Sequence, residues 1–195
     1  MALAYAPASA RPAWAALLAL DLRLAGIVRS VHEPLLAQVR LAWWRDRLGE
    51  DCANWPAGEP VLQALRGWNG HYAGLIALVD GWEELLGEAP LPSASLAALA
   101  EGRAQAFVAL SRALGEEASI GATHALGLRW ALADLAGHLS HPQEIAAVRA
   151  LLEASDAKVS RLPRSLRPLP VLHALATRDG GRAILVAMRL GLFGR

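Results

Sequence analysis

The chain has 195 residues and a formal net charge of +1, and 54% of its residues are hydrophobic. A chain of this length buries roughly two-thirds of its unfolded surface as one domain, so we expect a single domain over 1–195. Alanine, leucine and arginine dominate and β-branched residues are few, which favours helix throughout. The basic residues are not interleaved with aromatic ones, which argues against a nucleic-acid-binding protein.

The helical periodicity of the apolar residues predicts helices over 12–30, 34–48, 60–67, 71–86, 93–114 and 117–139. A further helix starts at 140–143 and runs to about residue 154. Residues 162–170 contain three prolines and should form an extended strap, followed by two short helices over about 170–178 and 180–192. The sequence therefore predicts an all-α fold, a single helical bundle.

The first two predicted helices are joined by only a few residues, so we expect them to lie antiparallel and to pack on each other. The apolar face that we predict for the first helix comprises Trp14, Leu17, Leu18, Leu24, Ala25 and Val28. The corresponding face of the second comprises Leu35, Leu36, Val39, Trp43 and Leu48.

Three features of the sequence predict the cellular compartment. Cys52 is the only cysteine, which excludes an intramolecular disulfide and fits a reducing cytosol. The N-terminus lacks the pattern of a signal peptide, and no stretch of ~18 residues is free of charge. We therefore expect a cytoplasmic protein. The basic C-terminal segment, 158–195, holds one lysine and seven arginines against a single acid and could add peripheral contact with a membrane.

One stretch carries a family resemblance. Residues 16–28, the sequence Glu-Pro-Leu-Leu at 33–36 and the sequence Arg-Leu-Ala-Trp-Trp-Arg-Asp at 40–46 resemble the squalene/phytoene synthase family. The resemblance implies a bundle of the isoprenoid synthase type, shortened relative to the catalytic members. It is greatest to a divergent branch whose mitochondrial relatives assist the assembly of respiratory complex I.

In the catalytic members, two aspartate-rich motifs on facing helices hold Mg²⁺, which neutralises the diphosphate leaving group of an allylic substrate. The first motif, D-D-x-x-D, aligns with residues 25–29, where Ala25 and Arg29 replace its outer aspartates. In the second, D-x-x-x-D, Asp134 keeps the first acid and His138 replaces the last. Neutral imidazole is a poor ligand for Mg²⁺, so the resemblance implies a family member that has lost its metal.

The alternative is a reduced metal set of Asp80, Glu84 and Asp134, which would serve a magnesium-dependent prenyltransferase. Asp80 and Glu84 are four residues apart and share one helix face. A solvated acidic helix surface is the simpler interpretation of the same residues.

Asp21 lies on the apolar stripe of the first helix, where an unpaired carboxylate would cost several kcal/mol. We expect it to form a structural ion pair with Arg40 or Arg45 of the adjacent helix. Arg40, Trp43 and Arg45 match the helix-packing signature of the family and are also the candidates for binding a substrate or lipid.

Two alternative functions are consistent with these residues and with the resemblance. In the first, the chain is a non-catalytic family member without a cofactor that binds a partner protein, an isoprenoid or other lipid, or a membrane surface, in the manner of an assembly factor. In the second, it is a prenyltransferase that uses Mg²⁺ and isoprenoid diphosphates. Fold analogy alone does not decide between them.

Overall fold

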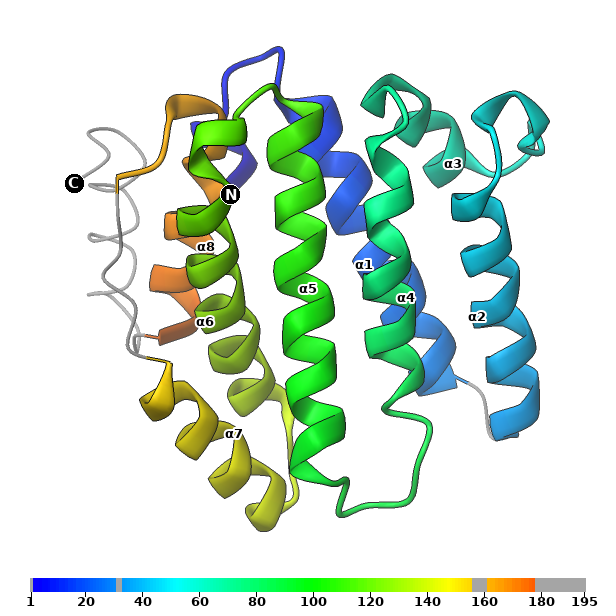
Figure 1. Ribbon diagram of the computed structural model, residues 1–195. Coiled ribbons are helices and arrows are strands. Elements are labelled where there is room, and N and C mark those ends of the chain that lie inside the picture. Colours follow the sequence, from blue (N-terminus) through cyan, green and yellow to red (C-terminus); the bar gives the residue numbers. More distant parts are fainter. Residues whose placement is uncertain (1, 31–32, 156–160, 178–195) are drawn as a thin grey trace.

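The computed structural model describes residues 2–30, 33–155 and 161–177, and within these ranges the chain is helical without β-strands (Figure 1). The α-helices are α1 (Arg11–Ser30), α2 (Pro34–Gly49), α3 (Pro60–Leu65), α4 (Ile76–Glu83), α5 (Ser93–Ala113), α6 (Ile120–His138), α7 (Pro142–Ala154) and α8 (Pro168–Thr177). The predicted all-α fold is confirmed. None of the described helices combines the length and the apolar character needed to cross a bilayer.

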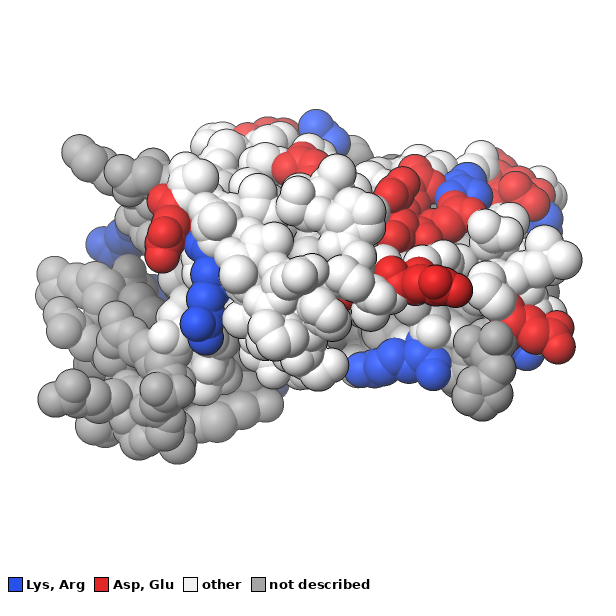
Figure 2. All heavy atoms as spheres, turned by 90° about the horizontal axis from the view of Figure 1, so that it is seen from below, with Lys and Arg blue, Asp and Glu red and all other residues white. Residues whose placement is uncertain are grey.

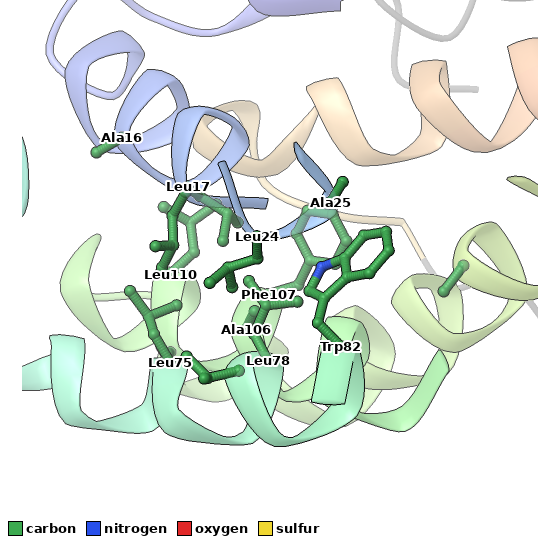
Figure 3. Packing of buried hydrophobic residues seen from close by; sticks show 14 of the residues in the cluster. Ala16, Leu17, Leu24, Ala25, Leu75, Leu78, Trp82, Ala106, Phe107 and Leu110 are labelled. Carbon is green, nitrogen blue, oxygen red and sulfur yellow. The ribbon is translucent and has the colours of Figure 1, made fainter. Parts of the chain in front are cut away.

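Helix α5 is the centre of the bundle. It packs against α4 on one side and α6 on the other, with α1 behind them, α2 at one edge and α7 and α8 at the opposite edge (Figure 1). Leu17 and Leu24 of α1 project towards the side chains of α4 and α5, among them Phe107 (Figure 3). The apolar face predicted for α1 therefore lies in the core.

A row of aromatic rings links three helices across this core. Trp14 of α1 lies 5.6 Å from Phe107 of α5, and Phe107 lies 5.2 Å from Trp130 of α6, measured between ring centroids. The indole nitrogen of Trp14 donates a hydrogen bond of 2.8 Å to the backbone oxygen of Ser165. This bond fixes the segment before α8 to the start of α1.

Helices α4 and α5 approach each other closely because each has a glycine where the backbone of the other helix passes. A Cβ atom added to Gly102 would overlap the carbonyl oxygen of Ala77, and one added to Gly81 would lie 2.9 Å from the Cα atom of Leu99. Both distances are shorter than a van der Waals contact. Trp82 follows Gly81 and Arg103 follows Gly102, so the close packing of the two helices places these two side chains at the same level of the bundle.

Several helix boundaries differ from the prediction, and the differences at α4 and α8 have clear local causes. Residues 71–75 form a 3₁₀ helix before α4 begins at Ile76. Helix α8 starts at Pro168, inside the segment predicted to be extended, because Pro168 and Pro170 both lie in its first turn, where backbone N–H groups have no helical acceptor. The helix predicted over 180–192 lies outside the described residues.

The apolar face predicted for α2 is wrong except for Leu48. The buried residues of α2 are Ala37, Leu41, Trp44 and Leu48, whereas Leu35 is 73% exposed and Val39 is 60% exposed. Helix α2 carries two apolar stripes on different sides, and its position at the edge of the bundle covers only one of them. The stripe that contains Trp44 packs against α4 and α1.

Because the contact between α4 and α5 leaves no room for a methyl group, Gly102→Ala should lower the free energy of unfolding by about 2 kcal/mol through overpacking. Gly121→Ala is the matched control, since nothing lies within 4 Å of a Cβ atom there. Its free energy of unfolding should stay the same or rise by up to ~1 kcal/mol. Urea denaturation followed by circular dichroism measures both, and equal stability of the two variants would contradict the close packing.

Candidate functional site

The most connected polar side chain of the described core is Arg103, in the middle of α5. It is 7% exposed. Its Nη2 and Nε atoms donate to the two carboxylate oxygens of Asp21 on α1 at 3.1 and 3.2 Å, and its Nη1 atom donates to Asp134 on α6 at 2.9 Å. One guanidinium therefore joins α1, α5 and α6, and we call this set the Arg103 clamp.

Two tryptophans enclose the clamp. The guanidinium carbon of Arg103 lies 5.0 Å from the ring centroid of Trp82 and 5.1 Å from that of Trp130, within the range of cation–π attraction. The indole nitrogen of Trp82 also donates to Asp21 at 2.7 Å. Asp21 thus accepts three hydrogen bonds, and its carboxylate has a partner on each side that faces the core.

The electrostatics of the clamp favour a permanently charged Arg103. Burial alone would lower the pKa of Arg103, but attraction to Asp21 and then to Asp134 outweighs it and raises the pKa above the ordinary arginine value. Two carboxylates share one guanidinium, and Asp134 keeps contact with solvent because its side chain is 26% exposed. The carboxylate charge that Arg103 does not neutralise therefore lies on the side of Asp134, where the clamp meets solvent.

The clamp forms part of the wall of a cavity of about 280 Å³ between α1, α4 and α6. The lining residues are Leu18, Asp21, Leu22, Ala25, Arg29, Trp82, Arg103, Trp130, Asp134, Leu135 and His138. Figure 3 shows the indole of Trp82 beside Ala25 at this place. Apolar side chains make up one part of the wall, and the clamp, Arg29 and His138 make up the other.

The positions that the sequence assigned to the two metal-binding motifs line this same cavity. Ala25 and Arg29 come from α1, and Asp134 and His138 come from α6. The ring of His138 turns back to its own helix, where Nδ1 lies 2.7 Å from the backbone oxygen of Asp134 and 3.6 Å from its carboxylate. The positions of the two motifs therefore line one cavity, as the resemblance implies, but alanine, arginine and histidine stand there in place of three aspartates.

The donor set of this cavity does not fit Mg²⁺. Both of its carboxylates already bind the guanidinium of Arg103, and Arg29 adds a second cation to the wall of the cavity. Among the described residues, no group of three or more histidine, cysteine, aspartate or glutamate side chains is arranged to hold a metal ion. A divalent ion would need Arg103 to leave first.

The alternative metal set, Asp80, Glu84 and Asp134, is not brought together. Asp80 binds the Nε atom of Arg45 at 2.7 Å, and Glu84 accepts a hydrogen bond of 3.3 Å from the hydroxyl of Ser95. Neither lines the cavity that contains Asp134. Seen from below, acidic side chains gather on the surface on the side of α2 and α4 (Figure 2).

The partner predicted for Asp21 is also wrong. Asp21 pairs with Arg103, while Arg45 binds Asp80 and Glu83. The hydrogen bond to Glu83, followed by the one to Asp80, raises the pKa of Arg45 against the opposing effect of burial. Asp21 does not reach Arg40 or Arg45 because its carboxylate lies towards α4 and α5 rather than towards α2.

The remaining candidates lie away from the cavity. Arg40 lines a surface groove beside α1, and Trp43 is 39% exposed on α2 with its ring edge-on to Trp44. Arg103 was missed by sequence reasoning. The sequence nevertheless holds a signal for this residue. Arg103 is a lone charged residue on the apolar face of a helix, spaced by about one turn from Leu99 and Phe107, with Leu110 a further turn along.

Asp21→Asn should lower the free energy of unfolding by about 3 kcal/mol, because it removes the buried charge that Arg103 faces. The matched control is Asp80→Asn, which weakens an ion pair whose carboxylate side chain is 53% exposed and should cost less than about 1 kcal/mol. Urea denaturation of both variants gives the comparison. A loss for Asp21→Asn no larger than that for the control would show that the clamp does not stabilise the bundle.

Comparison with known proteins gives one match. Residues 1–105 match the family model described as squalene/phytoene synthase, which is more than half of the 195 residues. The matched range includes Asp21 and Arg103 and ends before α6. No curated protein and no solved structure matches the chain significantly.

Proposed function

The chain belongs to the squalene/phytoene synthase family, and we propose that it is a non-catalytic member that acts by binding. The observation that carries the proposal is the Arg103 clamp. The carboxylates of the cavity, Asp21 and Asp134, are held by a guanidinium of the same chain. The function then rests on what the bundle binds, which is a partner protein, a lipid or a membrane surface.

The chemistry of the family explains why the clamp supports this proposal. An allylic diphosphate ionises only when cations neutralise the charge of the leaving group. Arg103 is a cation in the cavity wall, but two carboxylates already neutralise it. A diphosphate could use it only by displacing Asp21 or Asp134, and would then leave a buried carboxylate without a partner, which is costly.

Binding a lipid, a membrane surface or a partner protein would each use a different part of the molecule. A lipid would find apolar walls in the cavity of about 280 Å³, and the proposal requires no cofactor there. Contact with a membrane would use the basic C-terminal segment, of which only residues 161–177 are described. An assembly-factor-like role, as in the mitochondrial relatives that the sequence resembles, would require a protein partner.

A second candidate function is favoured by one observation. Asp134 lines an apolar-walled cavity at the position where the resemblance places a catalytic acid. A magnesium-dependent prenyltransferase would need Arg103 to release this carboxylate when the substrate binds. Transfer would then depend on Asp134, which gives the two functions opposite expectations.

The assay is magnesium-dependent release of pyrophosphate from farnesyl or geranylgeranyl diphosphate. We expect the wild-type protein and Asp134→Ala to release pyrophosphate equally, at the rate of the buffer alone. A family enzyme with both aspartate-rich motifs serves as the positive control. Turnover by the wild-type protein that collapses in Asp134→Ala would contradict the proposal and establish the second function.

A further inference from the structure

Two helices present apolar stripes to the outside of the bundle. On α1 the outward residues are Ala15, Ala19, Leu22 and Gly26, spaced by four, three and four positions. This spacing keeps them on one side of the helix. Leu22 is 67% exposed, so the stripe is open to solvent.

The second stripe lies on α2 and consists of Leu35, Leu36, Val39 and Trp43, which are 39–73% exposed. Together with Leu22 these are the large hydrophobic side chains that are exposed within the described part of the chain. Scattered exposed leucines are ordinary on a protein surface, but a contiguous group indicates an interaction site.

A groove runs along the stripe on α1 and reaches α2 at Arg40. It is an open cavity of about 680 Å³, lined by Ala19, Leu22, Arg23, Gly26, Ile27, Arg40 and Val61. Arg40 lies about 40° around α2 from Leu36, so it stands where the groove meets the apolar stripe of that helix. Nothing lies within 4 Å of a Cβ atom added to Gly26, so the groove is open above this residue.

The charge of the groove is set by Arg40. Arg23 pairs with Glu59 at 3.3 Å, which offsets its charge. Arg40 has no carboxylate partner among the residues that the structure describes, and it is exposed. An occupant with an acidic side chain beside Arg40 would complete this surface.

We propose that the groove and the stripe on α2 form a docking surface for an amphipathic helix of a partner protein. The apolar face of that helix lies over Leu22, Gly26 and Leu36, and an acidic residue on its flank meets Arg40. Recognition of a helix in a groove uses this combination of apolar anchors at helical spacing and flanking charge.

Two other occupants fit less well. An anionic membrane would present negative charge to the whole stripe on α2, including the exposed acids Glu33 and Asp46, whereas a partner helix can place its acidic residue beside Arg40 alone. A second copy of the chain, related by twofold symmetry about the groove, would bring a second Arg40 to the same contact.

This inference rests on the proposed function insofar as it names the partner, but the surface lies outside the cavity of the Arg103 clamp apart from Leu22, which lines both. Pyrophosphate release would therefore overturn the proposed function and leave the docking surface intact. Failure to bind a helix would do the reverse.

The experiment titrates the full chain with a synthetic amphipathic peptide that carries leucines at i, i+3, i+4 and i+7 and glutamates along its flank. We expect fluorescence anisotropy to show binding that Gly26→Trp weakens at least tenfold, because the indole fills the groove. Gly121→Trp on α6 is the matched control, since this glycine also has open space, and its binding should equal that of the wild-type protein. Unfolding midpoints confirm that both variants fold.

A charge swap tests the role of Arg40. A twin peptide with lysines in place of glutamates should bind the wild-type protein about fivefold more weakly, and Arg40→Glu should invert this preference. Arg149→Glu on α7 changes the net charge equally at an exposed site and should leave the preference unchanged.

Four outcomes would overturn the proposal. They are no binding of the glutamate peptide, equal weakening by Gly26→Trp and Gly121→Trp, sedimentation as a dimer that Gly26→Trp dissociates, and binding to anionic phosphatidylserine vesicles that Gly26→Trp abolishes. The third result would assign the surface to a second copy of the chain, and the fourth would assign it to a membrane.

Discussion

The buried guanidinium of Arg103 is the constraint on which the rest of the structure depends. It binds Asp21 across 82 positions of sequence and Asp134 across 31, so it fixes three helices at one level of the bundle. Each member of the set needs the others, because a buried charge without its partner costs several kcal/mol. The glycines between α4 and α5 bring Trp82 to the same place, where its ring and its N–H group complete the enclosure.

The same interaction decides what the cavity can do. Relatives that ionise diphosphates need carboxylates with free lone pairs aimed at divalent ions. Here the carboxylates are already hydrogen-bonded to a cation that belongs to the chain, and Ala25 and Arg29 of α1 line the same cavity. The bundle keeps the cavity while the charges in it balance internally. Under the proposed function, such a bundle would act through what it binds rather than through chemistry in this cavity.

The sequence is informative where the physics is local and uninformative where it is not. The helices were predicted because apolar periodicity and prolines in first turns act within a few residues. The covered face of α2 was not, since Leu41 and Trp44 form one apolar stripe, Leu36 and Val39 another, and only the tertiary neighbours select between them. Asp21 was correctly expected to need a cation, but its partner lies on a helix distant in sequence. Likewise, Asp80 and Glu84 share a helix, yet their surroundings, Arg45 above all, could not be predicted from spacing.

The most direct test of this account is a crystal structure of the protein grown with Mn²⁺ and a non-reactive thiolo analogue of farnesyl diphosphate. We predict that the guanidinium of Arg103 remains between Asp21 and Asp134 and that no anomalous manganese signal appears in the cavity. A manganese ion coordinated by Asp134, with Arg103 turned away from it, would contradict the account.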